Sequence, residues 1–144
     1  MSSVVVDTSF AFKWVVDEQG HQVARRLLLN WQQDDVHRLA PSLILSEINT
    51  PLLKLCRQGR FVLADALTAR DLVFEILEVL PDDDALTRRA MEIADALGLR
   101  NAHDSLFLTL AGRHDCDLWT ADERFWNVAK AAHPRVHWLG EHGP

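Results

Sequence analysis

Four acidic residues stand where carboxylates are unusual and where they could bind a metal ion. Each follows or interrupts an apolar segment: Asp7, Glu47, Asp104 and Asp122. Carboxylates crowded together repel one another, and they stay ionised only when a cation neutralises them; otherwise some take up protons. Oxygen ligands of this kind suit Mg²⁺ or Mn²⁺. If the four side chains converge, the sequence predicts a divalent-metal site.

Each acid also has a structural explanation when it is taken alone. Asp7 stands where an N-cap of the following helix is expected, and the stem of Glu47 can cover apolar surface. Asn101 and Asp104 match an N-cap and its N3 acid, and Asp122 is favoured by the dipole of the helix after it. The conjunction favours a shared site, because three acids follow strands or begin helices and the fourth lies within two turns of a helix start.

Two local patterns bear on the backbone beside these acids. Thr120 and Glu123 match a capping box, which leaves Asp122 with no capping role. Pro51 cannot donate the hydrogen bond that the carbonyl of Glu47 would normally accept. The helix that carries Glu47 is therefore expected to bend near Pro51.

The elements that must position these acids follow from the hydrophobic pattern. Strands are expected at 4–6, 37–40, 78–80, 117–120 and 136–139, and helices at 10–16, 21–33, 41–58, 63–77, 84–97, 102–111 and 121–132. Strands that alternate with helices predict an α/β fold, a three-layer α/β/α sandwich with a parallel sheet of about five strands. Ligands bind such sheets at the carboxyl ends of the strands, where Asp7 is expected.

Length and charge limit the possible functions. The 144 residues fit one domain spanning 1–144, and no apolar stretch is long enough to suggest a membrane span. The N-terminus lacks the basic region of a signal peptide, so we expect a cytoplasmic protein. A net charge of −6 argues against non-specific coating of nucleic acid. Two local basic groups remain: Lys54, Arg57 and Arg60, and Arg25 with Arg26.

The sequence offers no familiar side-chain nucleophile. It contains no G-x-S-x-G elbow, no P-loop and no convincing Cys–His pair, and its histidines lack the spacing of a zinc site. Divalent ions in a nuclease activate a bound water and align it with a phosphodiester. A carboxylate site of this type needs no nucleophile from the protein.

Two other functions are compatible with acids above a parallel sheet. An aspartyl-phosphate phosphatase or receiver domain needs a second acid close to Asp7 and a lysine near the last strands. The sequence has Ser9 at the place of that second acid, and no lysine follows Lys130. A catalytically silent module that binds only RNA or a protein is made less favourable by four intact acids. That second alternative stays open.

Three segments carry a resemblance to a known family. They are VVVDTSFAFKWVVDE at the start, APSLILSEINTPLLKLCRQGR in the middle and LGLRNAHDSLFLTLAGRHDCDLWTADERF towards the end. Together they resemble the PIN-domain ribonucleases, and most closely the VapC-type toxins of bacterial toxin–antitoxin pairs. The resemblance covers nearly the whole chain and implies a divalent-metal-dependent endoribonuclease of α/β/α architecture. By the family's pattern the acidic cluster is Asp7, Glu47, Asp104 and Asp122, with Asp7 and Asp104 foremost as direct metal ligands.

The resemblance also implies roles for neighbouring residues. Thr8, Ser9 and Thr120 stand where the family tends to carry small hydroxylic residues, and they are expected to support the ligands or position water. His103 departs from the pattern, because many relatives have tyrosine before the third acid. This difference concerns substrate contacts rather than metal binding.

Partners are implied in the same way. Besides an RNA substrate, VapC-type toxins usually have an antitoxin partner, whose C-terminal segment lies in a groove beside the active site, and most form homodimers. We expect Phe12, Trp14 and Leu28 to line such a groove. The alternative is that these three residues are ordinary core.

Overall fold

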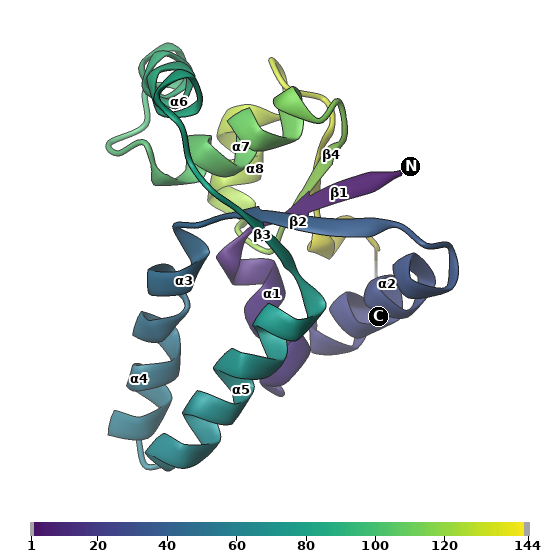
Figure 1. The fold of residues 1–144 in the computed structure, drawn as a ribbon, viewed down its shortest axis with the longest axis vertical. Helices are drawn as coiled ribbons and strands as arrows, with labels where there is room; N and C mark the ends of the chain where they lie inside the picture. Colours follow the sequence, from purple (N-terminus) through teal and green to yellow (C-terminus); the bar gives the residue numbers. More distant parts are fainter. Residues whose placement is uncertain (1, 143–144) are drawn as a thin grey trace.

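Five short strands form a fully parallel sheet in the order β3–β2–β1–β4–β5 (Figure 1). The structure is a computed structural model that describes residues 2–142. The strands are β1 (Ser3–Val6), β2 (His37–Pro41), β3 (Glu78–Leu80), β4 (Asp117–Thr120) and β5 (Val136–Trp138). In the centre, Val5 of β1 is in register with Leu39 of β2 and Leu118 of β4. The predicted α/β fold with a five-stranded parallel sheet is confirmed.

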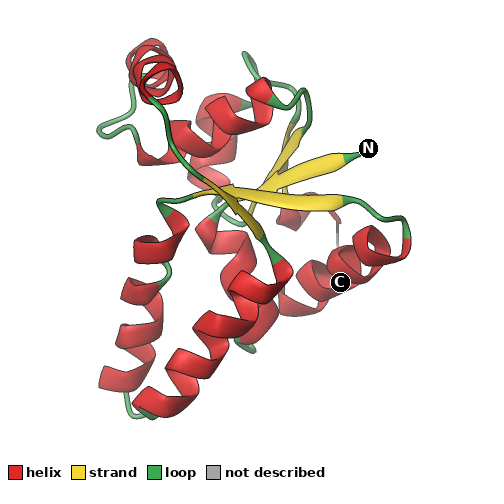
Figure 2. Ribbon diagram, in the orientation of Figure 1, coloured by secondary structure: helices red, strands yellow, loops and turns green. Residues whose placement is uncertain are grey.

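Helices cover both faces of this sheet, as Figure 2 shows. In Figure 1 helices α6, α7 and α8 lie above the strands, and α1 to α5 lie below them. The helices are α1 (Thr8–Val15), α2 (His21–Gln33), α3 (Ile44–Glu47), α4 (Asn49–Arg57), α5 (Leu63–Ile76), α6 (Asp84–Leu97), α7 (His103–Arg113), α8 (Glu123–Ala129) and the 3₁₀ helix η1 (Leu139–His142). None of those within residues 2–142 is long and apolar enough to cross a membrane.

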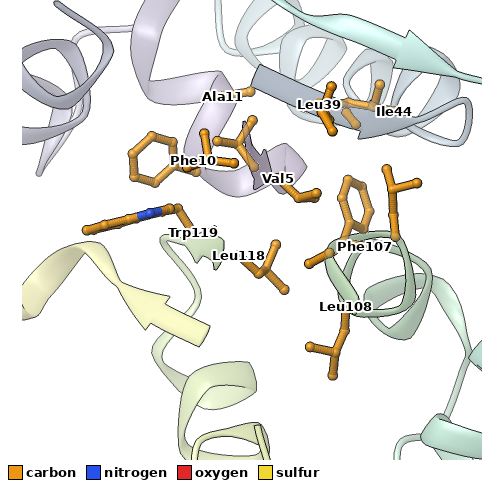
Figure 3. Packing of buried hydrophobic residues seen from close by; sticks show 14 of the residues in the cluster. Val5, Phe10, Ala11, Leu39, Ile44, Phe107, Leu108, Leu118 and Trp119 are labelled. Atoms are coloured by element: carbon orange, nitrogen blue, oxygen red, sulfur yellow. The ribbon is translucent and has the colours of Figure 1, made fainter. Parts of the chain in front are cut away.

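The core fixes the two helices that carry much of the candidate site. Val5 lies between Phe10 of α1 and Phe107 of α7 (Figure 3), and all three side chains are almost completely buried. A second apolar cluster joins α1 to α4 and α5. It contains Phe12 of α1, Leu52 and Leu55 of α4, and Ala66 and Ala69 of α5. Burying an aromatic or aliphatic side chain of this size contributes about 1.5–3 kcal/mol. Helices α1 and α7 are therefore held firmly against the sheet.

The predicted helix over 41–58 is two helices. Pro41 belongs to β2, and the helical segment is interrupted at Ile48, between α3 and α4. Pro51 explains the interruption, because it has no N–H to donate to the carbonyl of Glu47. The expected bend is thus present as a break, and it leaves Glu47 as the last residue of α3.

Three other predicted helices have an end that is wrong by two residues or more. Helix α1 begins at Thr8 rather than at Phe10, because Asp7 is its N-cap. Helix α7 does not stop before Gly112 but continues to Arg113, since a glycine inside a helix costs only about 1 kcal/mol. Helix α8 covers Glu123–Ala129, which is shorter than the predicted 121–132. Its later start matters for the site, because Ala121 and Asp122 are then free to line the sheet edge.

The turn between α1 and α2 depends on Gly20. Its φ is +88°, and a Cβ there would lie 2.6 Å from Cδ2 of Leu139. Gly20→Ala is therefore expected to lower the free energy of unfolding by more than the ~1–2 kcal/mol of a left-handed backbone penalty. Gly98→Ala is the matched control in urea denaturation, because Gly98 has a φ of +70° and no atom within 4 Å of its Cβ position. Equal losses of unfolding free energy in the two variants would show that the overlap of the new methyl group with Leu139 has no effect.

Candidate active site

Four carboxylates from four separate elements line one pocket of about 440 Å³. Asp7 follows β1, Glu47 ends α3, Asp104 lies in the first turn of α7, and Asp122 follows β4 at the start of α8. Parallel strands bring their carboxyl ends to the same edge of the sheet. The structure therefore brings together all four acids that the sequence singled out.

Asp7 is buried, with 7% of its surface exposed, and both of its oxygens accept hydrogen bonds. Oδ1 accepts from the hydroxyl of Ser9 at 2.7 Å and from the N–H of Phe10 at 3.0 Å, and Oδ2 accepts from the hydroxyl of Thr120. The pKa of Asp7 is raised to about 7. Burial is the main cause and the charge of Asp104 adds to it, whereas these three hydrogen bonds act in the opposite direction. Asp7 is thus both the N-cap of α1 and a carboxylate of the pocket.

Two hydroxyl groups join the end of β1 to the end of β4. Thr120 donates to Asp7 and accepts from the N–H of Asp122 at 3.0 Å. Ser9 donates to Asp7 and accepts from the N–H of Ala121 at 3.0 Å. The relative position of the two strand ends is therefore set by hydrogen bonds that pass through Asp7.

The capping box predicted at Thr120 is wrong. Asp122 is the N-cap of α8, and its Oδ1 accepts from the N–H of Phe125 at 3.2 Å. Thr120 is fully buried with its hydroxyl bound to Asp7, so it cannot cap the helix. Glu123 is then the first residue of α8 rather than its N3 residue.

Asp104 is a half-buried carboxylate without a hydrogen-bond donor from residues 2–142. Burial raises its pKa, the charge of Asp122 raises it further, and His103 lowers it. The predicted pairing with Asn101 as N-cap is wrong, because Asn101 accepts from the N–H of His103 and Ala102 stands at the cap position. Asp104 therefore has no structural hydrogen bond that would explain its position.

Glu47 faces the same pocket from α3. Its Oε1 accepts from the hydroxyl of Thr8 at 2.8 Å, and its Oε2 lies 4.0 Å from Nδ1 of His103. Burial raises the pKa of Glu47; Thr8 and His103 lower it, and Asp104 raises it. His103, the residue that departs from the family's tyrosine, is therefore an exposed neighbour of the acids.

The chemistry of these donors fits Mg²⁺ or Mn²⁺, since all four are carboxylates. The charge of Asp104 raises the pKa of both Asp7 and Glu47, which shows that the acids act on one another. In the described part of the chain, no three acidic, histidine or cysteine side chains are grouped closely enough to hold an ion directly. Binding thus requires the side chains to turn towards the cation, which would offset their repulsion.

Two charged residues of the pocket were missed from the sequence. Nζ of Lys13 donates to Oε1 of Glu18 at 2.9 Å and to the carbonyl of Gln19 at 2.7 Å. Lys13 could have been found from the sequence, because it follows Ser9 by four residues and therefore lies on the same face of the helix. Glu18 had none, since it lies in the irregular turn after α1.

The three residues expected to line a partner groove belong largely to the core. Phe12 touches the acidic pocket, but it is buried in the second apolar cluster. Trp14 is instead buried in the core, where its indole N–H donates to the carbonyl of Ala24 at 3.1 Å. Leu28 packs against the same core. For Trp14 and Leu28 the core alternative is correct.

Comparison with known families identifies the chain. Its residues 4–131 match the PIN domain. The chain belongs to the PIN domain family. This confirms the family expected from the three sequence segments, and PIN domains are generally nucleases. No curated protein matches the sequence.

Two solved structures share the fold of this PIN domain. PAE2754 from Pyrobaculum aerophilum aligns with a TM-score of 0.69 and 20% identity, over 98% of this chain and 93% of that one. Mycobacterium tuberculosis VapC20, a toxin that cleaves the sarcin–ricin loop, aligns with a TM-score of 0.63 and 17% identity, over 93% of this chain and 98% of that one. At these identities the likeness shows the fold alone.

Proposed function

We propose that this PIN domain is a divalent-metal-dependent endoribonuclease and the toxin of a toxin–antitoxin pair. The observation that carries the proposal is the pocket of about 440 Å³ lined by carboxylates from four separate elements. The fold shared with VapC20, a toxin that cleaves the sarcin–ricin loop, supports the same function. An antitoxin, an RNA substrate and a second copy of the chain are the partners that the family resemblance implies.

In this proposal Asp7, Asp104 and Asp122 hold the metal, and Glu47 lies beside them in the same pocket. Mg²⁺ or Mn²⁺ bound there would lower the pKa of a water and stabilise the charge on the phosphate. Asp104 is free to turn to a cation because no hydrogen bond from residues 2–142 holds it.

The hydroxyls of the pocket orient carboxylates rather than attack the substrate. Ser9 and Thr120 each donate their single hydroxyl proton to Asp7, and Thr8 donates its proton to Glu47. Their lone protons are therefore already committed. This arrangement supports hydrolysis by water, without a covalent intermediate on the protein.

Glu47 is the group that we assign to accept the proton of that water. Its Oε1 is held by Thr8, its Oε2 lies 4.0 Å from Nδ1 of His103, and the residue lines the pocket. Its pKa is raised by burial, and a general base works best when its pKa lies nearer the working pH than that of an ordinary carboxylate.

The proposal is tested with the purified chain, free of any antitoxin, and structured RNA. Cleavage is expected with Mg²⁺ or Mn²⁺ and is expected to stop when EDTA is added, because carboxylate oxygens bind these hard cations. Gel analysis of labelled RNA gives the cleavage products. Adding back excess Mn²⁺ should restore cleavage; activity that persists in EDTA would contradict the metal mechanism.

A further inference from the structure

A second cavity, of about 520 Å³, adjoins the acidic pocket. The two share Lys13 and Ala121, so Lys13 stands on the boundary between them. The second cavity is formed by the turn after α1, the start of α2 and the segment from β5 to η1. Its volume lies within the range of ~300–1,000 Å³ that is usual for sites of small molecules.

The charges of the acidic pocket give Lys13 a role. Five carboxylates line that pocket, including Glu18, and Lys13 is the one cationic side chain among its lining residues. A phosphate that enters is repelled by the carboxylates unless positive charge meets it. Nζ of Lys13 uses two hydrogens, for Glu18 and for the carbonyl of Gln19, and an ammonium group has three. Lys13 therefore has a donor left for a phosphate oxygen.

The second cavity offers the groups that recognise a nucleobase. Trp138 is half-buried and packs on Trp126 with ring centroids 5.3 Å apart. A Cβ at Gly140 would overlap the Trp138 ring, so the ring lies directly against the backbone of η1 and is held in place. The amides of Gln19 and Gln22 each present both a donor and an acceptor at the same cavity. An unpaired base can stack on an indole that is held in place, and its edge can form hydrogen bonds with amide groups that both donate and accept.

We propose that the second cavity binds one nucleotide of single-stranded RNA next to the cleaved phosphodiester. The base lies against Trp138 with its edge towards Gln22, and its phosphate lies on Lys13 at the entrance to the acidic pocket. Glu123, which also lines the cavity, accepts a hydrogen bond from an exocyclic amino group. The subsite therefore favours adenine or cytosine over uracil. This inference rests on the proposed nuclease function, because it places the nucleotide relative to the acids.

Binding is measured by fluorescence anisotropy on the full chain carrying Asp104→Asn, with Mg²⁺ present. The probes are fluorescein-labelled ten-nucleotide oligo(A), oligo(C) and oligo(U). Trp138→Ala is expected to weaken binding of oligo(A) about fivefold or more, as loss of one stacked base does. Lys13→Ala is expected to weaken all three probes and to lower the slope of log Kd against log salt by about 0.7, as loss of one phosphate contact does for single strands.

Matched controls come from residues of the same charge or type elsewhere. Arg88→Ala removes an exposed cation of α6, and Gln32→Ala removes an exposed glutamine at the far end of α2. Gln22→Ala and Glu123→Gln alter exposed residues and should fold even if Trp138→Ala does not. Glu123→Gln is expected to reduce the preference for oligo(A) and oligo(C) over oligo(U).

The outcomes separate the subsite from the nuclease function. If the unmodified chain fails to cleave RNA but Lys13→Ala and Gln22→Ala weaken binding more than their controls, the nuclease proposal fails and nucleotide binding in the cavity stands. If the chain cleaves RNA and folded Lys13, Gln22 and Trp138 variants bind and cleave at the same positions as before, the subsite is overturned.

Discussion

Asp104→Asn is expected to reduce RNA cleavage by more than about a hundredfold while leaving the fold intact. Removing even a partner of a metal ligand commonly costs 10–100-fold in activity, and Asp104 is assigned as a direct ligand. Asparagine has the same shape but lacks the negative charge that a divalent cation requires. The measurement is the initial rate of cleavage of a labelled RNA in Mg²⁺ or Mn²⁺.

The same variant should not be destabilised in the absence of metal. Asp104 accepts no hydrogen bond from residues 2–142, and its raised pKa shows that its charge is unfavourable in the folded state. Asp71→Asn is the control, because Asp71 is an exposed residue of α5 outside the pocket. If Asp104→Asn melts at the same temperature as the parent protein but retains more than about a tenth of its activity, Asp104 is not the metal ligand that the proposed mechanism requires.

Asp7→Asn is expected to stabilise the metal-free protein at pH 8. Burial raises the pKa of Asp7 from the model-compound value of 3.8 to about 7 in the folded state. At about 1.4 kcal/mol for each pH unit between the two values, the ionised carboxylate costs the fold up to about 4 kcal/mol. Asparagine keeps an acceptor for the N–H of Phe10 and carries no charge, so most of this cost should disappear.

The pH dependence of this effect has a definite sign. Between pH 3.8 and about 7 the folded protein binds more protons at Asp7 than the unfolded chain does. The contribution of Asp7 to stability therefore falls as the pH rises through this window, and it stays constant above the window. Urea denaturation in EDTA at pH 5 and pH 8 should show a larger gain from Asp7→Asn at pH 8.

Asp83 provides a control with the opposite sign. Its carboxylate binds Arg113 through two hydrogen bonds, at 2.6 and 2.9 Å, which lowers its pKa to about 2. The stability from Asp83 is present above pH 3.8 and is lost as the pH falls towards 2. Asp83→Asn should therefore destabilise the protein at pH 8. If Asp7→Asn also destabilised it there, the crowded and buried site would be disproved.

Much of the fold could be predicted from local sequence. The β-branched run at Val4–Val6 is apolar on both sides because helices cover both faces of the sheet, and periodic apolar residues mark the helices. The acids could be found because parallel strands end at one edge, so Asp7 and Asp122 had to lie near each other. Asp104 near the start of one helix and Glu47 within two turns of the start of another were expected at the same edge, and the three-segment resemblance implied the same four acids.

The details that could not be predicted depend on contacts between distant parts of the chain. Thr120 looked like a cap from its neighbours, but its hydroxyl is bound to Asp7, 113 residues away. Trp14 is an aromatic residue of the kind that anchors a partner in a groove, yet its indole N–H donates a hydrogen bond inside the core. The cavity beside Lys13 is enclosed by η1 and the turn at Gly20, and no sequence pattern joins these two segments.

The bond between Thr120 and Asp7 also makes completion of the acidic site depend on the synthesis of β4. Strand β1 pairs with β4, and Asp122 lies two residues after the end of β4. During synthesis from the N-terminus, Asp7 and Glu47 are made long before these partners exist. A chain that terminates before β4 lacks one acid entirely and leaves another without the hydroxyl that orients it. The acidic site is therefore complete only after β4 has been made and has paired with β1.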